Sequence, residues 1–172
     1  PLFFTNNNSQ YLANMLSNNT NFWDSIRNGN LDTIKAYLEE QPQAINQKNE
    51  RGFTPLILAA YYNQVAVFDY LIAQGADIHT PDAIGNTALM GACFKGYLDI
   101  IEKLVKLGAD VNVRNNQGAT ALIYASTFNK PEIAKLLLAH GADVTIKDGE
   151  GRTAQDHAKA QGLAWAETLF VS

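Results

Sequence analysis

One phrase recurs along this chain at a fixed step of 33 residues. Its copies begin at Gly52, Gly85, Gly118 and Gly151, and a threonine stands two residues after each of these glycines. A Gly-Ala-Asp triplet closes the three complete copies, at 75–77, 108–110 and 141–143. A period of this length is typical of stacked supersecondary units, each of which contacts mainly its neighbours, and it argues against a single globular core.

The composition is that of a folded domain. The 172 residues are enough for one domain, and with 47% hydrophobic and 17% charged residues the chain can bury a core. The net charge is −4, and Lys and Arg are scattered singly, which disfavours nucleic acid or an anionic membrane as the main partner. The longest apolar runs are far shorter than the ~20 residues that a membrane-spanning helix needs.

The single cysteine, Cys93, excludes an internal disulfide framework. Its register position holds Ala60 and Ser126 in the neighbouring copies, which favours a small core residue; a reactive thiol is the alternative. The lack of disulfides fits a reducing compartment, and we predict a cytoplasmic location. Because the chain begins at Pro1 without a methionine, upstream processing and export stay open.

The polar residues do not suggest a catalytic or metal site. His79, His140 and His157 are the three histidines of the sequence, and none has another His or a Cys at ligand spacing. With Cys93 in a core register, no pair of nucleophile and base is suggested either. We therefore predict no catalytic residue, no metal and no other cofactor.

Each repeating unit predicts two helices joined by a tight turn. Thr54, Thr87 and Thr120 precede short apolar stretches and suit the N-cap of a helix. The turn position holds Gly29, Asn63, Gly96, Asn129 and Gly162. Glycine and asparagine tolerate a left-handed backbone best, so we expect a positive φ in all five units. The glycine of each Gly-Ala-Asp triplet then ends the second helix.

The ends of the array differ from its middle. We place repeats at about 21–48, 49–81, 82–114, 115–147 and 148–172, with the first and last as caps that meet water. In the last unit, Gln155 and Lys159 replace apolar or small residues on a face that no further repeat covers, so we expect the array to end there.

Residues 1–20 form an Asn-rich extension outside the repeat, with a short helical stripe at Tyr11, Leu12, Met15 and Leu16. This extension either covers the end of the stack or folds onto a partner. Asn21 is predicted to cap the helix that follows.

The pattern resembles the ankyrin repeat family. The resemblance rests on the Thr-Pro/Ala-Leu opening, the small residue pair, the Gly/Asn turn and the Gly-Ala-Asp close, and it covers residues 21–172. One departure is clear: the family usually has a histidine after Thr-Pro-Leu, where this chain has Ile57, Met90 and Ile123. That histidine normally ties adjacent loops by hydrogen bonds, so its absence leaves the fine geometry of the loops open.

The resemblance implies an all-α solenoid of stacked antiparallel helix pairs with hairpin-like loops along one edge. It further implies a concave groove, formed by the loop tips and the exposed side of each first helix, in which family members generally bind other proteins without catalysis.

Positions that differ between the repeats are free to serve binding. The predicted partner-binding residues are Arg51, Phe53, Tyr61, Tyr62, Phe94, Lys95, Arg114 and Phe128. Aromatic side chains are the usual anchors of interfaces, and aromatics with peripheral cations suit an apolar, acidic peptide or protein surface. The alternative is that individual aromatics pack between repeats and that the cations are solvated loop residues, Lys147 and Arg152 among them.

We therefore predict a monomeric, non-catalytic protein–protein interaction module. A regulatory or inhibitory subunit of an enzyme or complex is an alternative. An enzyme or small-molecule binder on the same solenoid would need a deep pocket with convergent polar groups, which the sequence does not suggest.

Overall fold

The computed structural model describes residues 5–170, and within that range the chain is helical and contains no strand. The helices are α1 (Thr5–Asn28), α2 (Leu31–Glu40), the 3-10 helix η1 (Pro42–Asn46), α3 (Pro55–Tyr61), α4 (Val65–Ala73), α5 (Ala88–Lys95), α6 (Leu98–Lys106), α7 (Ala121–Thr127), α8 (Pro131–Ala139), α9 (Ala154–Ala160) and α10 (Trp165–Leu169). The expected all-α solenoid is confirmed. No helix in this range is both long and apolar enough to cross a membrane.

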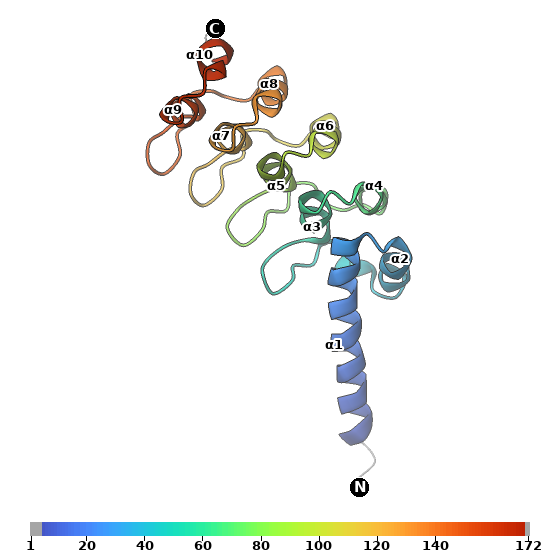
Figure 1. Ribbon diagram of the computed structural model, residues 1–172. Helices are drawn as coiled ribbons and strands as arrows, with labels where there is room; N and C mark the ends of the chain where they lie inside the picture. Colours follow the sequence, from blue (N-terminus) through green and yellow to red (C-terminus); the bar gives the residue numbers. More distant parts are fainter. Residues whose placement is uncertain (1–4, 171–172) are drawn as a thin grey trace.

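The helices form two rows (Figure 1). An inner row contains α3, α5, α7 and α9, an outer row contains α2, α4, α6 and α8, and the long loops between repeats project from the side of the inner row. Neighbouring inner helices contact each other along the whole row. Small residues make this close approach possible: Ala59, Ala92 and Ala125 stand at one register position, and each is fully buried.

Threonine starts each inner helix as the sequence predicts. The hydroxyls of Thr54, Thr87 and Thr120 accept hydrogen bonds of 3.2–3.3 Å from the backbone N–H three residues later. Thr153 does the same, and the Asp156 carboxylate returns a bond to the Thr153 N–H, which completes a capping box. Each bond satisfies an amide that helix geometry leaves without a partner.

The turn between the two helices of each unit has the predicted left-handed backbone. The φ angles are 75° at Gly29, 55° at Asn63, 89° at Gly96, 52° at Asn129 and 68° at Gly162. Because all five units share this conformation, every second helix leaves its turn in a similar direction. The regular spacing of the two rows depends on this position.

The core runs along the interface between the rows. Leu56, Leu89 and Leu122 are buried on the inner helices, and Ile100 and Leu104 on α6. Cys93 belongs to this core, as the register predicted, and its burial raises the pKa of the thiol. A buried thiol that resists ionisation is a structural residue rather than a nucleophile.

The first unit differs from its prediction in one respect. A single helix, α1, runs from Thr5 to Asn28, so no helix begins after Asn21. Its last turns carry Phe22, Trp23 and Ile26 into the core, while its first turns extend away from the stack (Figure 1). The predicted cap at Asn21 is wrong because the asparagines before it continue a helix that is anchored at its other end. The predicted stripe of Tyr11, Leu12, Met15 and Leu16 concerns side chains outside those that the structure describes.

Asparagine side chains join adjacent loops where the family has its histidine. Asn46 Oδ1 accepts the Asp77 N–H at 2.9 Å, and Asn112 Oδ1 accepts the Asp143 N–H at 2.8 Å. Asn112 Nδ2 also donates to the Gly141 carbonyl at 3.0 Å. These bonds link each loop to the next one, so the loops are held in register without that histidine.

Substitution of Gly96 tests the turn. We expect Gly96→Val to lower the free energy of unfolding by about 2 kcal/mol or more, because a β-branched side chain disfavours the left-handed backbone. Gly96→Asn should cost much less, since asparagine occupies the same position at 63 and 129. Urea unfolding followed by circular dichroism measures both, and equal losses would contradict the conformational explanation.

Ser126 offers a stabilising change. Its hydroxyl is buried, and Ser126 Oγ has no hydrogen-bond partner among the described residues. Since Ala60 stands at the same register position, we expect Ser126→Ala to raise the free energy of unfolding by about 1 kcal/mol. Chemical denaturation measures the difference. A loss of stability would instead mean that the hydroxyl makes a stabilising hydrogen bond.

Candidate partner-binding surface

Five aromatic side chains form a continuous row across three inner helices. This aromatic row consists of Tyr61, Tyr62, Phe94, Tyr124 and Phe128. Ring centroids are 6.1 Å apart between Tyr61 and Phe94, and 4.6 Å apart between Phe94 and Phe128. The rings therefore connect neighbouring repeats.

The row combines packed and exposed rings. Tyr62 is 43% exposed and Phe128 is 41% exposed, whereas Tyr61, Phe94 and Tyr124 are half-buried. The half-buried rings contribute to the contact between repeats, and the two exposed rings lie at the C-terminal ends of α3 and α7. Large exposed aromatic rings that rest on rigid neighbours are suited to bury further apolar surface.

Tyr124 was not among the residues predicted from the sequence. Its register position holds Leu58, Gly91 and His157 in the other repeats, so alignment of the repeats gives no aromatic signal. It stands one helical turn before Phe128, however, and that spacing places both rings on one face of α7. The Tyr124 hydroxyl donates to Asn86 Oδ1 at 3.1 Å, and burial raises its pKa.

The predicted cations occupy different environments. Lys95 Nζ lies 4.9 Å from the centre of the Tyr61 ring, which is a cation–π contact at the edge of the row. Arg114 donates to the Lys147 carbonyl at 2.9 Å and to the Gly118 carbonyl at 3.3 Å, so it joins two loops. Arg51 is exposed and lines a separate polar pocket of about 400 Å³ beside α1. The structure thus brings Lys95, but not Arg51, into contact with the aromatic row.

Phe53 lies at the first loop and is half-buried against the core. It lines an apolar pocket of about 240 Å³ together with Tyr61 and Phe94. Phe53 therefore lies beside the aromatic row, next to two of its members.

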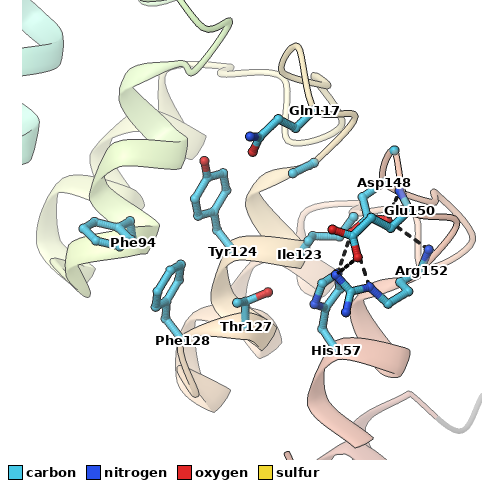
Figure 2. A pocket seen from close by; sticks show the side chains of 12 residues that line it. Phe94, Gln117, Ile123, Tyr124, Thr127, Phe128, Asp148, Glu150, Arg152 and His157 are labelled. Carbon is cyan, nitrogen blue, oxygen red and sulfur yellow. Dashed lines mark hydrogen bonds and ion pairs between the residues drawn. The ribbon is translucent and has the colours of Figure 1, made fainter. Parts of the chain in front are cut away.

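A larger pocket of about 610 Å³ opens at the other end of the row (Figure 2). Phe94, Tyr124 and Phe128 form one wall. Asp148, Glu150, Arg152 and His157 stand opposite, on the last loop and on α9. The pocket is therefore apolar on one side and charged on the other.

Asp148 organises the polar wall. Its Oδ1 accepts the backbone N–H groups of Glu150 and Arg152 at 2.9 and 3.0 Å, and its Oδ2 lies 2.6 Å from His157 Nε2. Burial alone would raise the pKa of Asp148, but the hydrogen bonds from Arg152, His157 and Glu150 outweigh it and lower the pKa. The Arg152 side chain pairs with Glu150, so these charges are engaged within the loop.

The Asp148 arrangement recurs in every loop. Asn49, Asp82 and Asn115 stand at the same step of 33 residues, and the Oδ1 of each accepts two backbone N–H groups of its own loop. The sequence contained this signal as an alternation of Asn and Asp in register, which was not used for the prediction. Each side chain holds its loop tip in a fixed shape beside the inner helices.

Charge is distributed unequally between the two faces. The loops and inner helices lie in segments 47–62, 80–95, 113–128 and 146–161. These segments carry seven of the 13 Lys and Arg residues but only five of the 17 Asp and Glu residues. Two of those acids, Asp82 and Asp148, are turned into loop hydrogen bonds. The inner face is therefore basic relative to the acidic chain as a whole.

Comparison with known families agrees with this architecture. A family model described as ankyrin repeats in three copies matches residues 6–82, 22–115 and 81–148. The chain belongs to the ankyrin repeat family. Ankyrin repeats are generally protein–protein interaction modules, and the family is generally non-catalytic.

Individual relatives match over short stretches. DNA-binding protein RFXANK of Homo sapiens is 39% identical over 51 residues, which are 30% of this chain and 20% of that protein. Human Ankyrin repeat domain-containing protein 49 is 39% identical over 57 residues, 33% of this chain and 23% of the relative. Ankyrin repeat family A protein 2 of Mus musculus is 50% identical over 38 residues, 22% of this chain and 12% of the relative. The chain thus matches less than a quarter of the length of these relatives.

The charged side chains that the structure describes do not assemble into a metal site. Within residues 5–170, no group of three His, Cys, Asp or Glu side chains is arranged to hold a metal ion. His157 and Asp148 form a pair in the wall of the larger pocket, where they fix the loop against α9.

The lowered pKa of Asp148 predicts a dependence of stability on pH. Because the folded state holds this carboxylate ionised more strongly than the unfolded state does, its contribution is full above about pH 4, the ordinary pKa of Asp, and is lost as the pH falls below it. In Asp148→Asn, the amide oxygen can still accept both loop N–H groups, as it does at Asn115. Its stability should therefore fall less steeply in acid.

Urea unfolding between pH 2.5 and 7 measures this difference. Glu167→Gln, on the exposed side of α10, is the control for the loss of one acidic group. Equal acid dependence in wild type and Asp148→Asn would show that Asp148 does not contribute.

Proposed function

We propose that this chain is a non-catalytic module that binds a protein or peptide in the groove beside its inner helices. The observation that supports this most is the aromatic row, in which two rings more than 40% exposed rest on half-buried rings from neighbouring repeats. Rigid aromatic side chains lose little entropy on binding and are enriched among the residues that dominate interface energies. The predicted binding residues beside the row are Phe53 and Lys95; Arg51 and Arg114 lie at the loop tips.

The partner we propose is an apolar segment with acidic residues. The aromatic row supplies apolar surface, and the inner face has more basic than acidic residues in a chain of net charge −4. Lys95 is the cation best placed to meet a carboxylate, because its ammonium group lies over Tyr61. Arg114 and Arg152 are engaged with loop groups, so the acidic preference should be strongest near Lys95.

A nucleic-acid partner is less well supported. One relative is named a DNA-binding protein, but the match covers 51 residues of repeat sequence. The basic residues of this chain are separated along the inner face and are partly engaged with loop carbonyls and carboxylates. A phosphate backbone is bound by several free cations at once, which this surface does not supply.

A regulatory or inhibitory subunit would use the same surface, because blocking an enzyme by binding it needs only the groove. We also propose a monomer in the cytoplasm, for which the buried Cys93 thiol and the lack of other cysteines are the support. Affinity capture from the host, with sedimentation of the purified chain, separates a stoichiometric protein complex from self-association.

The exposed rings test the binding surface. We expect Tyr62→Ala and Phe128→Ala each to weaken binding of the captured partner by about tenfold or more, because each removes an aromatic anchor. Both should change the free energy of unfolding by about 1 kcal/mol or less, because the rings are largely exposed. Calorimetric titration and urea unfolding give the two quantities.

Leu98→Ala is the matched control. Leu98 is an exposed apolar side chain, 39% accessible, at the start of α6 in the outer row. Its truncation should leave binding unchanged. If Tyr62→Ala and Phe128→Ala unfold the protein while binding survives in the folded fraction, the groove is not the binding surface.

A further inference from the structure

Gly91 is a glycine that the fold does not need. It lies inside α5 and lacks the positive φ that explains Gly96 in the turn that follows. A Cβ added there would have, outside its own helix and among the described residues, only the Tyr61 ring within 4 Å, at an ordinary 3.8 Å. Glycine inside a helix costs about 1 kcal/mol relative to alanine. Neither backbone conformation nor crowding compensates for this cost.

The other repeats fill the same position. Leu58, Tyr124 and His157 stand at steps of 33 residues from Gly91, and all three side chains are buried or half-buried on the inner face. Only the repeat with Gly91 leaves the space open. The result is the apolar pocket of about 240 Å³, lined by Phe53, Ile57, Tyr61, Met90 and Phe94, which we name the Gly91 pocket.

A second departure in the same repeat borders this pocket. The loop tip carries Ile84, which is 53% exposed, whereas the corresponding tips carry Arg51, Gln117 and Glu150. Ile84 also lines the Gly91 pocket. One repeat therefore has both an exposed apolar side chain where the others are polar and a missing side chain where the others are large. Both changes enlarge the apolar surface at one place.

The polar atoms at the edge of the pocket are already bonded. Asp82 Oδ1 accepts the N–H groups of Ile84 and Asn86. Asn86 Oδ1 accepts from the Tyr124 hydroxyl and from Asn115. A polar side chain that entered would lose its hydrogen bonds to water without replacing them, which disfavours it. An apolar side chain has no such loss.

We propose that the Gly91 pocket receives one aliphatic side chain, such as Leu, Ile or Met, from an extended segment of a partner protein. Its volume is below the ~300–1,000 Å³ of sites for whole small molecules, so it suits a single side chain. Lys95 Nζ lies over Tyr61, a wall of the pocket, and favours an acidic residue next to the aliphatic one. This inference rests on the proposed function and assigns its specificity to one place.

Two substitutions at Gly91 separate the pocket from the helix. Gly91→Ala adds a Cβ where there is room and should raise the melting temperature with little effect on binding. Gly91→Leu should be at least as stable as wild type, because Leu58 is buried at the same position, but its side chain fills the pocket. We expect Gly91→Leu to weaken binding tenfold to about a hundredfold, which corresponds to the loss of one buried aliphatic side chain.

The probe is a phage-displayed library of random 12-residue peptides, selected against the full chain, from which binders are synthesised. We expect the binders to share one aliphatic residue beside Asp or Glu, and replacement of that residue by Ala to weaken binding to wild type as much as Gly91→Leu does. The Ala peptide should bind wild type and Gly91→Leu equally, since both changes remove the same contact.

Two results would overturn the inference in different ways. Binders that require Tyr62 and Phe128 but bind Gly91→Leu as tightly as wild type would exclude the pocket and leave the groove as the binding surface. A selection whose binders are unaffected by Tyr62→Ala and Phe128→Ala, or that yields no binder, would overturn the proposed function, and with it the pocket.

Discussion

Contact between neighbouring inner helices is the interaction on which the rest of the structure depends. A pair of short helices such as α5 and α6 buries only part of its apolar surface internally, and the remainder is covered by α3 on one side and α7 on the other. The fully buried alanines at 59, 92 and 125 let the helices approach closely enough for this coverage. Loop geometry, groove shape and the spacing of exposed side chains all follow from that regular approach.

The groove inherits its order from this spacing. Phe94 contacts Tyr61 of the preceding repeat and Phe128 of the following one because the stack places equivalent turns side by side. The loop tips are held by a different device, the Asn or Asp side chain whose Oδ1 accepts two N–H groups of its own loop. Helices and loops are thus fixed independently. A partner would meet a preformed surface, which reduces the entropy lost on binding.

The repeat made most of the fold predictable, and its limits are physical. The Thr caps and the Gly/Asn turns were predicted because local chemistry decides them and five aligned units repeat the signal. The extent of α1 was not, since a helix anchored by Phe22 and Ile26 continues through asparagines that favour a cap locally. Arg114 was assigned to a partner, but the carbonyl of Lys147 that binds it lies on another loop, a contact that local sequence does not show. Tyr124 lies in the aromatic row through helical spacing, which alignment by repeats conceals.

Departures from the repeat are informative only after the demands of the stack have been subtracted. Gly96 and Gly91 are five residues apart on the sequence, yet the first is explained by a φ of 89° and the second by no backbone requirement. Asn63 and Asn129 replace Gly96 in other units, as a left-handed turn allows, whereas Leu58 and Tyr124 replace Gly91 with large side chains. A residue that lowers helix stability without serving the stack is best explained by what the empty space admits. The exposed Ile84 at the rim of that space gives the same direction, toward an apolar side chain from outside the chain.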